Sequence, residues 1–370
     1  MTTSIQIDGS QGEGGGQIIR SSLALALVTG RSLTIDNIRA GREKPGLMRQ
    51  HLTAVNAAIE ICGGVATGAA IGSKSLSFEP RPVRAGEYIF SVGTAGSATL
   101  VLQTVLPALL IANGPTLLTL EGGTHNPWAP PFDFLAKAFI PLINRMGPRV
   151  EIELERHGFF PAGGGRFRVH VQPSKLLRGF DLCERSQTVK HCVRVLLSKL
   201  PGHIGKREAD TIVRKLGWDP ALCAVEQVDS PGPGNAILVE VASDGVTEVF
   251  SEFGRQGVKA EHVAADVAKE VSTYLTAGVP VAEYLADQLM LPLGISAWQQ
   301  DPESPEGVCR GPVRQRGGAY RTLPLSRHST THIDLLRQIL GITIEIERSA
   351  DDKCCTVRIG SSSRLPGGEP

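Results

Sequence analysis

The chain has 370 residues, 41% of them hydrophobic, which is enough for a sizeable core in two domains or in one large domain with an insertion. Its 38 lysines and arginines nearly balance its 37 aspartates and glutamates. This balance excludes a protein that coats nucleic acid through an overall basic field, so a nucleic-acid partner would have to meet a local basic patch.

The seven cysteines form no C-x-x-C pair and are odd in number, which argues against a disulfide framework and against a thiolate zinc site. The N-terminal MTTSIQIDGSQ lacks the basic start and apolar core of a secretion signal. No stretch approaches the ~18 consecutive apolar residues of a membrane span. We therefore expect a cytoplasmic protein without a membrane partner.

The first part of the chain alternates strand and helix signals in the order βαβαββ. Its predicted elements are strand 4–7, helix 16–29, strand 32–38, helix 45–62 and two short strands ending near Phe78. The next part repeats this order. Its predicted elements are strand 87–91, helix 97–112, strand 116–121, helix 131–146, and strands 149–154 and 166–171.

A third block begins with a strand at 178–182 and is then interrupted. It resumes with helix 281–290, strand 320–323, helix 330–340, and strands 342–347 and 354–359. The interruption has its own signals, including helices 207–216 and 259–275 and strands 236–241 and 247–250. We predict an α+β fold: a large domain of three βαβαββ repeats (1–183 and 279–360) and a smaller α+β domain (184–278) inserted in the third repeat.

Two segments lack apolar periodicity. Residues 298–318 are rich in proline, glycine and charge and are expected to form a mobile surface loop. Residues 361–370 are expected to be a disordered tail.

A glycine-rich loop links the first predicted strand to the first predicted helix. Its glycines lie at positions 12, 14, 15 and 16, where backbone N–H groups face the start of a helix and suit an anion. Arg20, Arg39 and Arg42 follow in the same stretch, and a guanidinium group matches paired phosphate oxygens. The loop matches neither the dinucleotide nor the Walker fingerprint. It indicates one wall of a polyphosphate site, although glycine loops are also common connectors.

Four runs occur in this order: DGSQGEGGGQIIRSSLALA, IRAGREKPGLMRQHLTA, RHGFFPAGGG and EYLADQL. Together they resemble the RNA 3'-terminal phosphate cyclases, and the resemblance covers nearly the whole chain. It implies the three-repeat layout with an inserted domain, the use of ATP and a divalent cation (Mg²⁺ or Mn²⁺), and RNA 3'-phosphate ends as partners. A homodimer is one candidate assembly.

Of the nine histidines, His328 stands out because it lies just ahead of the amphipathic helix predicted at 330–340. The helix dipole there disfavours the imidazolium, and a neutral ring nitrogen can attack phosphorus. The resemblance implies that His328 attacks the α-phosphorus of ATP and becomes a covalent adenylate. His332 lies four residues on and permits a metal site, but with no third ligand evident we rank zinc low.

The resemblance assigns further site residues. Tyr284, Asp287 and Gln288 share one helical face and line the adenosine pocket. The implied nucleotide-binding residues are Gln50, Gln103, Tyr284, Leu285, Ala286, Asp287 and Gln288. Arg20, Arg39 and Arg42 join His328 as catalytic residues, and Glu13 is the implied metal ligand. Segment 126–132 is a rigid apolar loop that either flanks the base or is a structural turn, and 157–165 is assigned mainly a backbone role.

The implied activity is a three-step conversion of an RNA 3'-phosphate to a 2',3'-cyclic phosphate through histidine–AMP and RNA(3')pp(5')A intermediates, with release of pyrophosphate and AMP. Two alternatives stay open. Enolpyruvyl transferases share the repeated architecture, and a relative of the cyclases works in ribosome assembly without catalysis.

Overall fold

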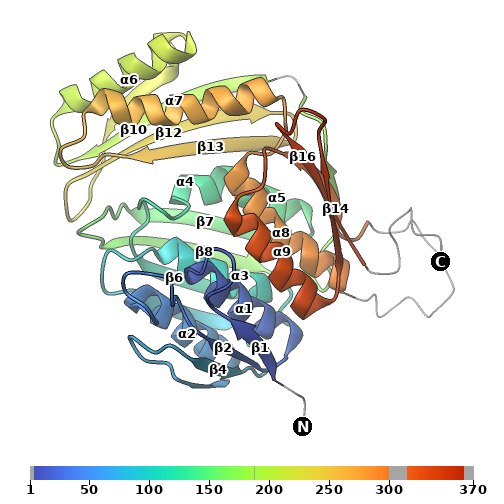
Figure 1. Ribbon diagram of the computed structural model, residues 1–370. Helices are drawn as coiled ribbons and strands as arrows, with labels where there is room; N and C mark the ends of the chain where they lie inside the picture. Colours follow the sequence, from blue (N-terminus) through green and yellow to red (C-terminus); the bar gives the residue numbers. More distant parts are fainter. Residues whose placement is uncertain (1–3, 187, 300–314, 362–370) are drawn as a thin grey trace.

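A computed structural model describes residues 4–186, 188–299 and 315–361. Most of the predicted 298–318 loop and nearly all of the predicted tail lie outside these ranges. The described chain builds four four-stranded sheets and a set of helices, which confirms the α+β class (Figure 1). Among the helices of the described ranges, none combines the length and apolar character that crossing a membrane requires.

Three of the four sheets have the same topology. In each, the first two strands in sequence are parallel neighbours, and the fourth strand lies between the second and the third. The orders are β1-β2-β4-β3, β5-β6-β8-β7 and β9-β14-β16-β15. Identical topology in three segments shows that the repeated βαβαββ pattern of the sequence is a repeated structural unit.

The bounds of the three units follow. The first comprises β1 (Ile5–Asp8), α1 (Gly16–Thr29), β2 (Leu33–Asp36), α2 (Arg49–Cys62), β3 (Val65–Thr67) and β4 (Leu76–Glu79). The second comprises β5 (Gly86–Ser91), α3 (Ala98–Leu109), β6 (Thr116–Gly122), α4 (Phe132–Phe134), the π-turn η1 (Leu135–Phe139), α5 (Ile140–Arg145), β7 (Arg149–Arg156) and β8 (Gly165–Gln172). The third comprises β9 (Phe180–Leu182), α8 (Glu283–Trp298), β14 (Gly318–Thr322), α9 (Arg327–Leu340), β15 (Thr343–Arg348) and β16 (Cys355–Gly360).

Between β9 and α8 the chain builds the fourth sheet, whose order is β11-β10-β12-β13. Its elements are β10 (Thr188–Ser198), α6 (Gly202–Leu216), the 3-10 turn η2 (Pro220–Leu222), β11 (Cys223–Gln227), β12 (Gly234–Ser243), β13 (Val246–Phe253) and α7 (Ala260–Ala277). This sheet lies at the top of Figure 1, and the first repeat lies at the bottom. Helices α6 and α7 pack together over it, and β13 also contacts η1 and α4 of the second repeat.

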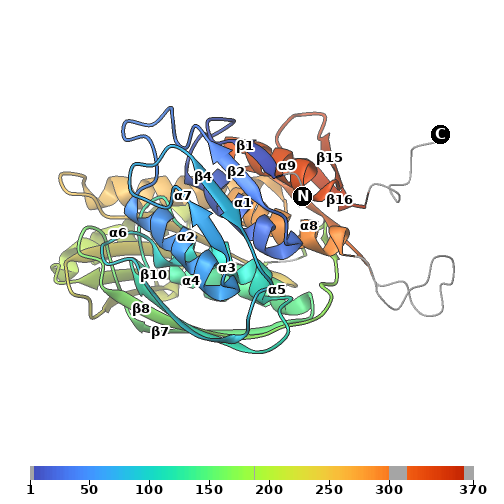
Figure 2. The same ribbon diagram turned by 90° about the horizontal axis from the view of Figure 1, so that it is seen from below.

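The helices of the repeats meet in the middle of the molecule. α1 packs against α2, α3 and α9, and α9 packs against α8 (Figures 1 and 2). α1 is buried along most of its length, because its apolar residues occupy nearly every side of the helix. This packing brings the loop before α1 next to the start of α9, although more than 300 residues separate them in sequence.

Several predicted boundaries were wrong. Helix α9 begins at Arg327 rather than at 330, because the Ser326 side chain caps it by accepting a bond from Ser329 N at 3.1 Å. α2 begins at Arg49 rather than at 45, because the chain turns at Gly46, whose φ is +82°. α8 runs on to Trp298 through an internal proline, because its second half is buried on all sides. The predicted helix 131–146 is divided by η1, and the sequence did not predict β10 or β11.

Candidate functional site

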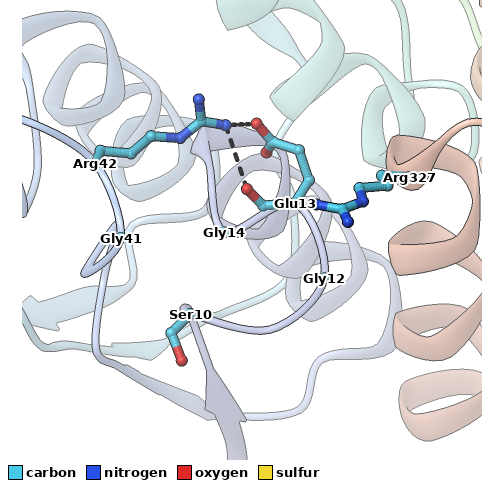
Figure 3. Close-up of a pocket in the computed structure, with 7 residues that line it drawn as sticks. All are labelled: Ser10, Gly12, Glu13, Gly14, Gly41, Arg42 and Arg327. Carbon is cyan, nitrogen blue, oxygen red and sulfur yellow. Dashed lines mark hydrogen bonds and ion pairs between the residues drawn. The ribbon is translucent and has the colours of Figure 1, made fainter.

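The loop between β1 and α1 forms one wall of a cavity of about 410 Å³ (Figure 3). The cavity is lined by Ser10, Gly12, Glu13, Gly14, Gly41, Arg42 and Arg327. Gly12 has φ +57°, and a Cβ atom there would lie 1.9 Å from Thr331 Oγ1 of α9. Only glycine therefore fits between the loop and α9. Glu13 N and Gly14 N are bonded within the fold, but no side chain caps the start of α1, so the N–H groups there remain for an anion.

Arg42 and Arg327 flank this loop from opposite sides, with Glu13 between them (Figure 3). The Arg42 guanidinium forms an ion pair with the Glu13 carboxylate and donates to the Glu13 carbonyl at 3.2 Å. Arg327 makes no hydrogen bond or ion pair through its guanidinium with any other residue that the structure describes. Two guanidinium groups lining one cavity make it suitable for phosphate oxygens.

Glu13 has the position that a metal ligand needs. Its Oε2 atom is buried and accepts no hydrogen bond within the described chain, and it lies 4.0 Å from His328 Nδ1. Among the described residues no cluster of three or more His, Cys, Asp or Glu side chains could hold an ion by itself. A single carboxylate fits Mg²⁺ or Mn²⁺ bound mainly through the phosphates of a nucleotide.

His328 is the second residue of α9 and is tied to α1 through Gln17. Its Nδ1 atom lies 2.8 Å from Gln17 Oε1, and Gln17 Nε2 donates to both carboxylate oxygens of Asp287, at 2.8 and 3.1 Å. A carboxylate only accepts, so the amide nitrogen of Gln17 must face Asp287 and its oxygen must face His328. Nδ1 of His328 therefore carries the proton, and Nε2 keeps the lone pair.

The environment of His328 favours the neutral ring. Partial burial lowers its pKa below the usual value, Asp287 opposes this shift, and Arg20 and Arg42 add to it. About half of the side chain is exposed. The direction of the pKa shift is the one expected from the sequence, but its causes are burial and neighbouring charges.

Asp287 lies beneath this histidine rather than on the surface. Burial alone would raise the pKa of its carboxyl group, but His332, Gln17 and His328 together lower it. His332 is itself buried, with Nδ1 3.5 Å from Asp287 Oδ1. The structure thus places His332 against a carboxylate behind the site.

Arg20 and His51 lie together at the start of α1. A Cβ atom on Gly16 would fall 2.3 Å from His51 Nε2 and 2.8 Å from Arg20 Nη1, so the glycine gives both side chains access to the helix start. Burial lowers the pKa of His51 to about 3, helped by Arg20 and Arg39, and burial lowers the pKa of Arg20 to about 10. His51 accepts from Met48 N at Nδ1, so its proton is on Nε2 and points toward the helix start.

Arg39 has a different environment from the other two predicted arginines. Its backbone is left-handed, with φ +54°, and its Nη1 donates to the carbonyls of Lys44 and Gly46 at 2.6 and 2.9 Å. These bonds hold the 39–46 loop, which also carries Arg42. Arg39 therefore supports the loop with one end of its guanidinium.

The predicted nucleotide residues of α8 point in several directions. Gln103 Nε2 donates to Gln288 Oε1, so these two side chains meet. Tyr284 is 59% exposed, and burial of its ring raises the pKa of its hydroxyl to about 12. Leu285 and Ala286 are buried in the core, so their side chains face away from solvent.

Gln50 lies at the start of α2 and joins the first repeat to the second. Its Oε1 atom accepts from Ser97 N at 3.4 Å, beside the N-terminus of α3. The structure thus places Gln50 next to the helix that carries Gln103.

Three α+β repeats, a fourth inserted sheet and a cavity lined by two arginines beside a histidine define the structural class of this protein. A family model described as RNA 3'-terminal phosphate cyclase matches residues 11–346. The chain therefore belongs to the RNA 3'-terminal phosphate cyclase family. It is similar to proteins of that name from Koribacter versatilis (44% identical, covering 97% of this chain and 96% of the relative), Ectopseudomonas mendocina (45%, 92% and 94%) and Salmonella typhimurium (42%, 94% and 96%).

The sequence did not single out Gln17, His51, Arg327 or Thr331. Thr331 Oγ1 accepts from Glu13 N at 3.0 Å and so fixes the glycine loop against α9. A signal existed for Gln17, because an amide within an apolar helix must find polar partners. Arg327 gave a weaker signal, as a cation placed where a helix dipole disfavours it unless an anion is bound nearby.

Proposed function

We propose that this protein is an ATP-dependent RNA 3'-terminal phosphate cyclase that converts a 3'-phosphate to a 2',3'-cyclic phosphate. Family membership and the names of its relatives support the overall activity. The hydrogen-bond chain from Asp287 through Gln17 to His328, at the rim of a phosphate-sized cavity, is the single observation that carries the mechanism.

In the first step, Nε2 of His328 attacks the α-phosphorus of ATP, and the bond to the β-phosphate oxygen breaks. Pyrophosphate leaves with the electron pair of that bond. The ring keeps its Nδ1 proton, and the Nδ1–H group donates a hydrogen bond to Gln17 Oε1 as positive charge develops on the imidazole. Arg42, Arg327 and the N–H groups at the uncapped start of α1 offset the charge on the leaving phosphates. A divalent cation held by Glu13 would supply further charge neutralisation there.

In the second step, an oxygen of the RNA 3'-phosphate attacks the phosphorus of the adenylate, and the bond to Nε2 breaks. This produces an RNA(3')pp(5')A end and restores neutral His328. In the third step, the neighbouring ribose 2'-hydroxyl attacks the 3'-phosphorus and gives its proton to water. The P–O bond to AMP breaks, AMP leaves with the electron pair, and the ring closes. This last step is intramolecular, so its entropic cost is small.

Labelling with ATP tests the covalent step. Protein incubated with α-labelled ATP and Mg²⁺ or Mn²⁺ should retain acid-labile, alkali-stable AMP, as a phosphoramidate does, and His328→Ala should abolish the label. His203→Ala is a matched control, because His203 is also the exposed second residue of a helix, α6. Label that persists in His328→Ala would place the nucleophile elsewhere, and an enolpyruvyl transferase would take no label.

A further inference from the structure

The loop between β6 and α4 carries the most exposed large apolar side chain among the residues that the structure describes. Trp128 is 90% exposed, although an indole ring is usually at least partly covered. Its backbone is left-handed, with φ +64°, a conformation that bulky residues rarely adopt. Strain of this kind persists where the surrounding structure enforces it, and it gathers at functional sites.

The loop around Trp128 is held firmly at its base. Thr124 N and His125 N both donate to the carbonyl of Gly158, at 2.9 and 3.1 Å, and Phe132 N closes the loop on the Thr124 carbonyl at 2.9 Å. The Asn126 side chain donates to the carbonyl of Ala95. Because these hydrogen bonds already order the base of the loop, little conformational entropy is lost there when Trp128 contacts a ligand.

Contacts connect this loop to the reaction site. His328 binds Gln17, and the adjacent Gly16 lies against His51, the neighbour of Gln50. Gln50 in turn accepts from Ser97 N, and Ser97 pairs with Gly123 at the start of the Trp128 loop. Both the glycine loop and the Trp128 loop follow the carboxyl ends of parallel strands, where ligands of α/β sheets gather.

A second exposed aromatic residue belongs to the adjoining loop. His125 pairs with Phe159, and the next residue, Phe160, is 58% exposed. Tyr284, exposed on α8, is already assigned to the adenosine of ATP. Trp128 and Phe160 are therefore two exposed rings on adjoining loops, and these loops are linked to the reaction site through Ser97, Gln50 and Gln17.

We propose that Trp128 stacks on an unpaired nucleobase near the 3' end of the RNA substrate. The proposal rests on the proposed cyclase function and identifies where its second substrate binds. Stacking suits an enzyme that acts on RNA ends of any sequence, since every base offers a π face. Stacking also suits a chain whose charges nearly cancel, because it adds affinity for RNA that does not depend on an overall basic field.

Fluorescence tests the contact directly and without ATP. A short single-stranded RNA with a 3'-phosphate should quench the tryptophan emission of the protein, and Trp128→Phe should remove most of that quench. The same RNA with abasic sites at its last two positions should quench much less. Because no adenylation is needed, this measurement stands even if His328 takes no label. A quench that persists in Trp128→Phe would overturn the proposal.

Rates of adenylate transfer give the second test. Trp128→Ala should weaken RNA affinity in single-turnover transfer by roughly five- to a hundred-fold, the range found for single base–aromatic stacks. Trp128→Phe should stay within a few-fold of the unmodified protein. Ile89→Ala is the control, because Ile89 is also an exposed apolar residue, 66% exposed, on β5. Equal weakening of ATP-only labelling would assign Trp128 to the nucleotide, and unchanged transfer would assign it to neither; both results contradict the proposal.

Discussion

At the scale of single residues, the proposed binding of phosphate in the cavity depends on the planar shape of the arginine guanidinium groups. Arg42 lies against Glu13 and lines the cavity, where paired donors match a phosphate and a point-like ammonium does not. We expect Arg42→Lys to lower the initial rate of self-adenylation nearly as much as Arg42→Ala, by roughly a hundred- to a thousand-fold, as when one oxyanion donor is lost.

Circular dichroism should show that both Arg42 variants fold. Arg149→Ala, at an exposed arginine far from the cavity, should leave the rate unchanged. If Arg42→Lys stays within a few-fold of the unmodified protein, charge alone is enough and Arg42 does not clamp a phosphate.

The Asp287–Gln17–His328 chain predicts a change in pH dependence. The negative charge of Asp287 raises the pKa of His328 against the stronger effect of burial. Asp287→Asn removes that charge, so the acid limb of the self-adenylation rate should move to lower pH. The maximal rate should also fall, by roughly ten- to a hundred-fold, because Gln17 is then free to rotate its amide.

A pH–rate profile measured by labelling separates these two effects. A merely structural role for Asp287 would lower the rate without moving the acid limb. An acid limb that stays in place, or moves to higher pH, would contradict the proposed hydrogen-bond chain.

At the scale of elements, a buried carboxyl group joins the fourth sheet to the helix of the nucleotide residues. Glu248 of β13 is almost fully buried and accepts from Ala282 N, the N-cap of α8, at 2.6 Å. Burial raises the pKa of Glu248 to about 8, and the bond from Ala282 only partly opposes this. The group is therefore protonated in the folded protein at neutral pH.

This raised pKa makes stability depend on pH. Because the folded-state pKa exceeds the unfolded one, the contribution of Glu248 is full below about pH 4.5 and is lost as pH rises toward 8. Glu248→Gln keeps an oxygen acceptor for Ala282 N and removes the titration. We expect the variant to have a Tm at least a few degrees higher than the unmodified protein at pH 9, and a similar Tm at pH 5.

Thermal unfolding measured across this pH range checks the expectation. Glu345→Gln, at an exposed carboxylate of β15, should leave the pH dependence of Tm unchanged. A parallel pH dependence in Glu248→Gln and the unmodified protein would show that Glu248 does not titrate between these values.

At the scale of the whole molecule, a buried ionic network ties the fourth sheet to the second repeat. Asp133 of α4 binds Arg194 of β10 at 2.6 Å and His125 Nε2 at 2.8 Å, and Arg194 also forms a paired contact with Glu226. Burial would raise the pKa of Asp133, but His125 and Arg194 lower it to about 2. This contribution to stability is present above the unfolded pKa of about 3.8 and is lost as pH falls toward 2.

Removing the Asp133 carboxylate should leave Arg194 half-paired at this junction. We expect Asp133→Ala to lower the free energy of unfolding at pH 7 by about 3 kcal/mol, the low end for a broken buried pair, because Arg194 keeps Glu226. Asp210→Ala breaks the exposed Lys206–Asp210 pair and should cost less than about 1 kcal/mol. Urea unfolding measures both, and equal losses would show that the network does not join the two parts.

The division into a large domain and an inserted domain at 184–278 stays a proposal. The apolar residues on one face of the fourth sheet cluster with α6 and α7, which supports it, whereas those on the other face, such as Leu196, Leu238 and Phe253, belong to the main core. Limited proteolysis should cut first near 183–190 and 278–282, where the chain enters and leaves the fourth sheet. Early cleavage within β12 or α7 would contradict these boundaries.

The sequence by itself determined the periodic features of this protein. The βαβαββ order and the interruption in the third repeat follow from hydrophobic periodicity along the chain. The direction of the His328 pKa shift matches the expectation, but burial and neighbouring charges cause it rather than the helix start. Strand β10 was missed, because its valines and leucines are interrupted by Lys190, His191 and Arg194. Arg194 pairs with Glu226 of β11, and His191 stacks on Trp218.

Only the tertiary structure decided which side chains meet. Gln17 and His328 are 311 residues apart, and their contact exists because α9 packs against α1. The same packing sets Thr331 against Gly12 and places Asp287 beneath the histidine, where the sequence predicted a residue of the adenosine pocket. The Arg39 side chain instead bonds to carbonyls of its own loop, because its left-handed backbone directs it toward them. Local patterns carry no information on such contacts, because they depend on how separate elements dock.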